Sequence, residues 1–97
     1  MMVLITYDVN TETREGKSRL RRVAKQCVNY GQRVQNSVFE CSLNPAQLRK
    51  LEKILLDIID EKTDSIRFYN LGKSWKSRVK SIGRDDSYNP DEDLLML

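Results

Sequence analysis

Residues 1–43 alternate between extended and helical patterns of apolar and polar positions. Residues 2–9, MVLITYDV, are β-branched and apolar on both faces, which predicts a central strand covered on both sides. From residue 17 to residue 30, apolar side chains recur every three or four positions, which predicts an amphipathic helix. Gly31 is placed to end that helix in a left-handed conformation. Residues 32–43 lose their alternation near Asn36 and Ser37, which predicts one bent strand or two short strands.

The pattern from residue 44 onward predicts a second helix and further strands. Asn44, Pro45 and Gln47 form a capping-box start for a helix with an apolar stripe from residue 48 to residue 59. Residues 64–71 alternate as a strand, and Val79 and Ile82 indicate a short final strand. The resulting order of β, α, β, β, α and β elements is that of the split βαβ, ferredoxin-like arrangement.

We therefore expect an α+β fold, a ferredoxin-like βαββαβ domain with an antiparallel sheet, two helices on one of its faces and a short extra C-terminal strand. This domain spans residues 1–82, and residues 83–97 form an acidic and then apolar C-terminal tail. Apolar residues on both faces of the first strand need cover on the face opposite to the helices. A second copy of the chain supplies that cover most simply, so we expect a homodimer through the sheet side.

The charged residues are unevenly distributed along the 97 residues. Residues 1–80 hold 16 of the 17 Lys and Arg residues but only 9 of the 14 Asp and Glu residues. A basic body is typical of a protein with a polyanionic partner, although plain solubility explains a modest excess of cations equally well. No apolar run has the length of about 20 residues that a membrane span needs, and the N-terminus does not resemble a signal peptide. We therefore expect a cytoplasmic protein that does not enter a membrane.

The absence of histidine restricts the possible chemistry. It excludes the common zinc sites, Ser-His-Asp triads and Cys-His dyads. Cys27 and Cys41 stand apart in the sequence and are expected to be buried, apolar side chains. Catalysis would have to use carboxylates, a metal held by oxygen atoms, Lys, Tyr or Ser.

Asp8 is the first candidate for such chemistry, because a carboxylate at the end of an apolar strand must be solvated, paired or ligated. One interpretation is structural, with Asp8 accepting hydrogen bonds from the backbone of the following polar loop. The other interpretation is functional: Asp8 from both subunits of a dimer binds Mg²⁺ or Mn²⁺, ions that prefer hard oxygen ligands. Such an ion can activate water and stabilise the transition state of phosphodiester cleavage.

Several basic residues are candidates for nucleic-acid contacts. Those in and beside the first helix could bind phosphates, although a solvated helix face is the simpler interpretation. Arg33 follows a short segment that would hold its guanidinium rigidly, and the basic loop around Trp75 is suited to a nucleic-acid backbone. The candidate nucleic-acid-binding residues are Arg14, Lys17, Arg19, Arg22, Arg33, Lys76 and Arg78.

Three segments together resemble a known family. They are the apolar strand ending in Tyr7-Asp8-Val9, the basic helix ending in Tyr30-Gly31 and the stretch RVQNSVFE at residues 33–40. The whole chain, in length and element order, resembles the Cas2 family, the second of the two universal CRISPR-associated adaptation proteins. The segment RFYNLG at residues 67–72 and the acidic and apolar ending resemble the subtype I-C branch.

The resemblance implies a ferredoxin-like homodimer that partners the CRISPR integrase in spacer acquisition, with Mg²⁺-dependent endonuclease activity on RNA or double-stranded DNA. It makes Asp8 the catalytic and metal-binding residue, contributed by both subunits. It assigns Arg33 to phosphate or active-site contact, and Tyr7, Ser37 and Phe39 to shaping the site. The alternative within the same family is a catalytically silent DNA-binding scaffold of the integration complex, since one carboxylate per subunit is a sparse active site.

The C-terminal tail has a separate predicted role. Its three consecutive acidic residues, Asp91 to Asp93, would repel DNA, so the tail should point away from a duplex. Leu94, Leu95 and Met96 then form an apolar anchor that we expect to dock on the integrase or on the sister subunit, the alternative being a frayed terminus. A third function, unrelated to CRISPR, is a ferredoxin-like regulatory module with a small ligand between subunits, but the chain has no Gly-rich phosphate-binding loop.

Overall fold

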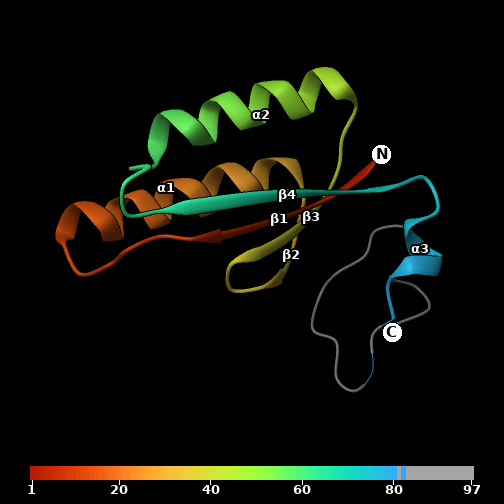
Figure 1. The fold of residues 1–97 in the computed structure, drawn as a ribbon, viewed down its shortest axis with the longest axis horizontal. Helices are drawn as coiled ribbons and strands as arrows, with labels where there is room; N and C mark the ends of the chain where they lie inside the picture. Colours follow the sequence, from red (N-terminus) through yellow and green to blue (C-terminus); the bar gives the residue numbers. More distant parts are fainter. Residues whose placement is uncertain (81, 83–97) are drawn as a thin grey trace.

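The computed structural model describes residues 1–80 and 82, which form an antiparallel sheet with the two long helices on one side (Figure 1). The strands are ordered β2-β3-β1-β4 in the sheet, and every pair of neighbours is antiparallel. This βαββαβ order confirms the predicted ferredoxin-like fold. The tail at residues 83–97, with Leu94, Leu95 and Met96, lies outside the described residues. The elements are β1 (Met2–Asp8), α1 (Arg14–Tyr30), β2 (Gln32–Gln35), β3 (Val38–Ser42), α2 (Pro45–Ile58), β4 (Ser65–Gly72) and α3 (Trp75–Arg78).

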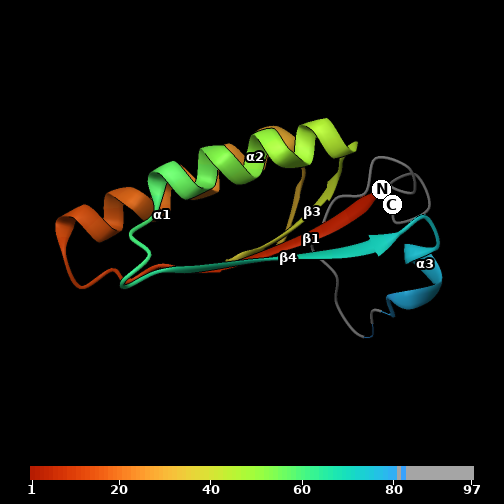
Figure 2. The same cartoon turned by 45° about the horizontal axis from the view of Figure 1, so that its top comes forward.

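The core lies between the sheet and the helices α1 and α2, which run over the same face (Figure 2). Along β1 the side chains of Val3, Ile5 and Tyr7 are buried, whereas Asp8 is exposed, as the alternation of a strand requires. Val3, Ile5 and Tyr7 therefore lie on one face of β1, and Asp8 lies on the other. Neither α1 nor α2 covers the other face of the sheet, which we call the helix-free face, and the short helix α3 lies at the end of β4 (Figure 2). The fully buried partners of β1 are Val23, Cys27, Phe39, Cys41, Leu51 and Leu55.

Local sequence signals explain where the elements begin and end. The predicted capping box of α2 is confirmed, because the Asn44 side chain accepts from the Gln47 amide at 2.8 Å and Gln47 Oε1 accepts from the Asn44 amide at 2.9 Å. Helix α1 begins three residues before the predicted start, at Arg14, because Thr13 Oγ1 caps it by accepting from the Gly16 amide at 2.9 Å. Asn36 and Ser37 form the turn between two short strands, which decides between the two predicted arrangements.

The predicted left-handed conformation of Gly31 is wrong. The residue has extended backbone, with φ −166° and ψ −160°, and its amide still donates to the Cys27 carbonyl at 2.9 Å. Glycine is required there by close packing, because a Cβ atom would collide with the Glu40 carbonyl and Cys41 Sγ and lie 2.8 Å from Cys41 Cα. The end of α1 is therefore pressed directly against β3.

We expect Gly31→Ala to lower the free energy of unfolding by about 2–3 kcal/mol, because backbone atoms of β3 must shift to admit a methyl group. Urea denaturation followed by circular dichroism measures this loss. Asn29→Ala is the control, since Asn29 is exposed on the same helix and should change stability by less than about 0.5 kcal/mol. Equal stability of Gly31→Ala and wild type would contradict the packing argument.

The predicted short final strand is also wrong for the residues that can be placed. After β4, Gly72 takes a positive φ of 75° and the chain turns into α3, where Ser77 donates to the Ser74 carbonyl through both its amide and its hydroxyl. Val79 and Ile82 are outside any strand and are 41% and 82% exposed. The physical reason is that two apolar residues cannot hold a strand without a neighbour to pair with, and none is present in the described chain.

The two thiols are buried and free, as predicted. Burial raises the pKa of Cys27 to about 12 and that of Cys41 to about 11, so both stay protonated at neutral pH. They contribute to packing between α1 and β3 and are not suited to nucleophilic chemistry.

Candidate functional site

Asp8 ends β1 at the edge of the helix-free face of the sheet. It pairs with Ser65 at the start of β4, and Thr6 pairs with Arg67 one step along the same face. These residues, together with Tyr69, line a shallow open groove. The sequence therefore placed the candidate carboxylate correctly at a strand end, and the sheet places it beside a cation and a phenol.

The Asp8 carboxylate has no hydrogen bond or ion pair with any residue in 1–80 or 82. The structural interpretation of Asp8 as the cap of the following loop does not hold, because other side chains have that role. Asn10 Oδ1 accepts from the Glu12 amide at 2.9 Å, and Asp64 Oδ1 accepts from the Asn10 amide at 3.0 Å. Asp8 is thus an exposed carboxylate whose oxygen atoms are available to a ligand.

Arg67 and Tyr69 are site residues that the sequence analysis did not assign. Arg67 Nη1 donates to the Tyr69 hydroxyl at 3.3 Å, and both side chains are exposed in the Asp8 groove. An exposed guanidinium beside a carboxylate is suited to hold a phosphate group. The alternation of β4 put Arg67 and Tyr69 on one face, but only the pairing with β1 shows that this is the face of Asp8.

Tyr7, Arg33 and Phe39 form a cluster on the helix side of the sheet, opposite to Asp8. The Arg33 guanidinium carbon is 5.1 Å from the centroid of the Phe39 ring, and the Tyr7 and Phe39 rings are 6.2 Å apart. The Tyr7 hydroxyl donates to the Asn36 carbonyl at 3.2 Å, and burial raises its pKa. Arg33 pairs with the fully buried Phe39, so within one chain the structure does not bring it into the Asp8 groove.

Ser37 contacts the end of β1 through its backbone. Its carbonyl accepts from the Tyr7 amide at 3.1 Å, which joins the turn between β2 and β3 to the residue before Asp8. Contacts of Tyr7 with Ser37 and with the Phe39 ring thereby hold this end of the sheet together. Tyr7 also lines the Asp8 groove, whereas Ser37 and Phe39 do not, and the role of the three residues in shaping the site stays a prediction.

The other basic candidates lie on helices α1 and α3. Arg14, Lys17 and Arg22 are exposed on α1, and Lys76 lies over Trp75 with its Nζ 5.8 Å from the ring centroid. Helix α3, which ends at Arg78, follows the end of β4 that pairs with Met2. That end is about 20 Å from Asp8 along the strand. Helix α3, with Lys76 and Arg78, therefore follows the end of β4 that is remote from Asp8.

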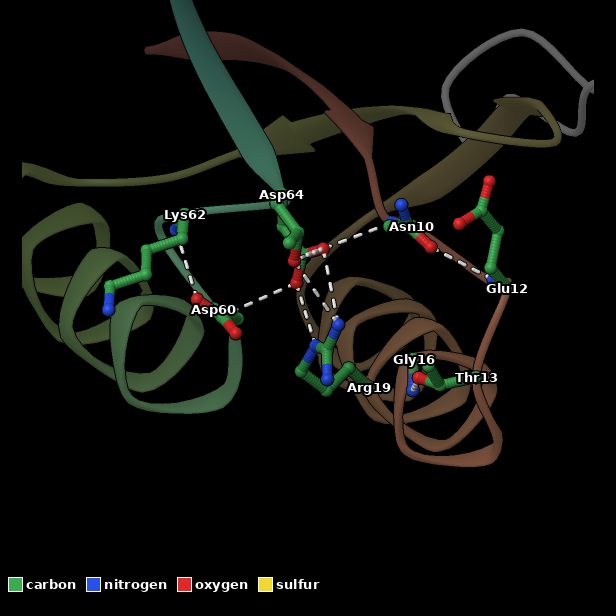
Figure 3. A network of polar contacts seen from close by, with 9 residues as sticks. Asn10, Glu12, Thr13, Gly16, Arg19, Asp60, Lys62 and Asp64 are labelled. Atoms are coloured by element: carbon green, nitrogen blue, oxygen red, sulfur yellow. Dashed lines mark hydrogen bonds and ion pairs between the residues drawn. The ribbon is translucent and has the colours of Figure 1, made fainter.

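Arg19, one of the predicted nucleic-acid contacts, forms an internal ion pair in the structure. Its Nε donates to Asp64 Oδ2 at 2.8 Å in an ion pair whose aspartate side chain is fully buried (Figure 3). Asp64 also accepts from the Asn10 amide, the Asp60 amide and the Thr63 hydroxyl, each at 3.0 Å. Burial alone would raise the pKa of Asp64, but the hydrogen bonds from Arg19 and its neighbours hold it well below its ordinary value. The structure therefore assigns Arg19 to this internal network, and its contact with nucleic acid stays a prediction.

Comparison with known proteins identifies the family. The family model for CRISPR associated protein Cas2 matches residues 1–79. This chain belongs to the Cas2 family. A CRISPR-associated endoribonuclease Cas2 from Chlorobaculum tepidum is 54% identical over 96 residues, covering 99% of this chain and 100% of the relative. A CRISPR-associated endonuclease Cas2 from Halalkalibacterium halodurans is 52% identical over 95 residues, covering 98% of this chain and 99% of that relative.

A solved structure of the Cas2 family confirms the fold. The crystal structure of Streptococcus pyogenes Cas2 at pH 6.5 superposes with a TM-score of 0.77 and 67% sequence identity, over 86% of this chain and 100% of that one. This similarity supports the ferredoxin-like α+β fold of this chain. None of the helices that the structure describes is both long enough and apolar enough to cross a membrane.

The oxygen donors of this Cas2 chain are sparse. Within residues 1–80 and 82, no three Asp, Glu, Cys or His side chains are grouped so that they could hold a metal ion. Asp64 precedes Ser65, the strand partner of Asp8. Its oxygen atoms, however, already accept hydrogen bonds from two backbone amides and from Arg19, with which it forms an ion pair. Residues 1–80 and 82 of one chain therefore offer only the Asp8 carboxylate in this groove, so a divalent cation held there would need further oxygen donors.

Proposed function

We propose that this protein is a metal-dependent endonuclease of phosphodiester bonds that works as a homodimer in CRISPR adaptation. The observation that carries the proposal is the exposed Asp8 carboxylate, which has no partner among the described residues and stands beside Arg67 at a sheet edge. The relatives named endoribonuclease and endonuclease support it, since both match nearly the whole chain. Cleavage assays on RNA and on double-stranded DNA distinguish the two possible substrates.

The homodimer is supported by the helix-free face of the sheet. Leu4, Val38 and Tyr69 belong to this face by strand pairing with β1, and Tyr69 is 42% exposed. Two copies that pack through this face gain apolar burial and contribute two Asp8 carboxylates to one site. The dimer thus removes the shortage of oxygen donors that a single chain shows.

The donor chemistry fits Mg²⁺ or Mn²⁺ held by the two Asp8 side chains and water, because Mg²⁺ commonly retains several waters and needs few carboxylates. Bound there, such an ion would lower the pKa of a water molecule and neutralise charge on the phosphate. In each subunit Asp8 supplies the negative charge, and Arg67 orients a phosphate oxygen. Thr6 and Ser65 offer hydroxyl groups along the same groove.

The proposed partners follow from the family and from the charge distribution. The exposed cations Arg14, Lys17 and Arg22 are suited to bind a duplex backbone, and the CRISPR integrase is the proposed protein partner. We also propose the subtype I-C branch on the basis of residues 67–72, RFYNLG. The alternative function, a silent DNA-binding scaffold, is supported by the single carboxylate, Asp8, that the described residues of one chain offer at this site.

The test is cleavage of end-labelled single-stranded RNA and duplex DNA with Mg²⁺, Mn²⁺ or a chelator. We expect at least about 100-fold faster cleavage of one substrate with a metal than with a chelator. Parallel binding assays on the same substrates serve as the control for protein quality. Binding without cleavage under any metal condition would contradict the nuclease proposal and leave the scaffold as the function.

A further inference from the structure

We propose that Asp64 is a positioning residue for Asp8. The inference rests on the proposed nuclease function of Asp8, but it concerns a different residue, one whose carboxylate faces the interior on the helix side. Asp64 directly precedes Ser65, and Ser65 is the strand partner of Asp8. It therefore lies at the point where β4 begins and where the chain leaves β1.

The Asp64 carboxylate joins three separate segments of the chain (Figure 3). Its Oδ1 accepts from the Asn10 amide in the loop after β1, and its Oδ2 accepts from the Asp60 amide in the loop after α2, both at 3.0 Å. Its Oδ2 also accepts from Arg19 Nε on α1 at 2.8 Å. The side chain is 0% exposed, so water does not compete for these contacts.

The connection to Asp8 goes through the backbone. Because the Asp8 side chain contacts no other polar group in residues 1–80 or 82, the position of its carboxylate depends on how firmly its main chain is held. On one side of Asp8, the Tyr7 amide donates to the Ser37 carbonyl. On the other side, Asp8 pairs with Ser65 at the start of β4, and beyond Asp8 the Asn10 amide donates to Asp64. Removing Asp64 therefore loosens both the loop that follows Asp8 and the start of the strand on which Asp8 pairs.

The loop after Asp8 is also held by close packing, which leaves it one well-defined path. A Cβ atom on Gly16 would collide with the Asn10 carbonyl oxygen and lie 3.0 Å from the Asn10 carbonyl carbon. The Asn10 carbonyl thus rests on the first turn of α1 while its amide is held by Asp64. A catalytic group displaced by about 1 Å can lose about 100-fold in rate, so this path matters for Asp8.

The test compares Asp64→Ala with Gly31→Ala, a variant expected to lose comparable stability at the opposite end of the sheet. Gly31 packs on Cys41, and Cys41 pairs with Val3, far from Asp8 along β1. Cleavage is measured well below both melting temperatures, so that each protein is folded. We expect Asp64→Ala to lose about 10–100-fold in kcat with KM changed by less than about 3-fold, as for residues that orient a metal-binding group. Gly31→Ala should keep its kcat within about 3-fold of wild type.

The second measurement is independent of cleavage. Hydrogen exchange of the Asn10 amide should become at least about 10-fold faster in Asp64→Ala but stay unchanged in Gly31→Ala. Titration with Mn²⁺ alone, followed by broadening of the Asp8 amide resonance, should require a higher concentration of the ion in Asp64→Ala. If wild type itself never cleaves, the proposed function fails, whereas the exchange and Mn²⁺ measurements still judge the role of Asp64.

Asp64→Asn keeps the test valid if Asp64→Ala does not fold. Its carbonyl oxygen can still accept from the Asn10 amide, whereas its NH₂ group cannot accept from Asp60. We therefore expect the kcat of Asp64→Asn to lie between those of wild type and Asp64→Ala. If Asp64→Ala does not fold, we expect the kcat of Asp64→Asn to be lower than that of wild type. The proposal is overturned if folded Asp64→Ala or Asp64→Asn matches Gly31→Ala in kcat and leaves Mn²⁺ binding at Asp8 unchanged.

Discussion

Asp8→Asn is expected to lower the rate constant of cleavage by at least about 100-fold, with the free energy of unfolding within about 0.5 kcal/mol of wild type. The activity falls because the amide cannot supply the negative charge that attracts a divalent cation to the groove. Stability is retained because Asp8 is exposed and its carboxylate has no hydrogen bond or ion pair within residues 1–80 and 82. A large loss of activity without a loss of stability distinguishes a catalytic carboxylate from one that supports the fold.

The measurement uses matched preparations of wild type, Asp8→Asn and Asp57→Asn, assayed on the substrate that wild type cleaves. Asp57→Asn is the control because Asp57 is also an exposed aspartate, but it lies on α2, away from the groove. It removes the same charge from the protein and should leave cleavage within about 2-fold of wild type. If all three proteins cleave equally, the activity belongs to a contaminant or to another site.

Asp64→Ala is expected to lower the free energy of unfolding by about 3 kcal/mol. The deletion leaves Arg19 without its partner and leaves the amides of Asn10 and Asp60 without their acceptor. The loss is at the lower end for a buried ion pair, because the Arg19 side chain is 17% exposed and can reach water. Urea denaturation at pH 7 measures it, and a loss below about 1 kcal/mol would contradict the buried network.

The stability provided by Asp64 should depend on pH in one direction. Because its pKa in the folded protein lies below the ordinary value of 3.8, folding is favoured while the carboxylate is charged. The contribution is complete above about pH 5 and is lost as the pH falls through 3.8 toward the folded-state pKa. The difference in unfolding free energy between wild type and Asp64→Asn should therefore shrink from pH 5 to pH 3. Asp57→Asn is the control, and a difference for Asp64→Asn that grows with acid would contradict the assignment.

Much of the fold was predictable because its signals are local. The capping box at Asn44 and Gln47, the apolar stripes of both helices and the burial of Val3 and Ile5 each depend on residues a few positions apart. The wrong predictions concern contacts between distant segments. Glycine is required at position 31 because of its close packing on β3 and not because of its backbone dihedral angles. The pattern of Val79 and Ile82 carries no information about a strand with which they could pair.

For the candidate site, the sequence by itself determined that Asp8 stands at the end of an apolar strand and that the chain lacks histidine, which leaves oxygen ligands as the available chemistry. Only the tertiary structure decided which side chains surround it. Arg19 and Asp64 are 45 residues apart and meet because α1 and the start of β4 pack at the same end of the sheet. Arg33 and Arg67 lie on opposite faces because strand pairing sets the direction of each side chain. Such contacts depend on long-range pairing and burial, which a local pattern does not encode.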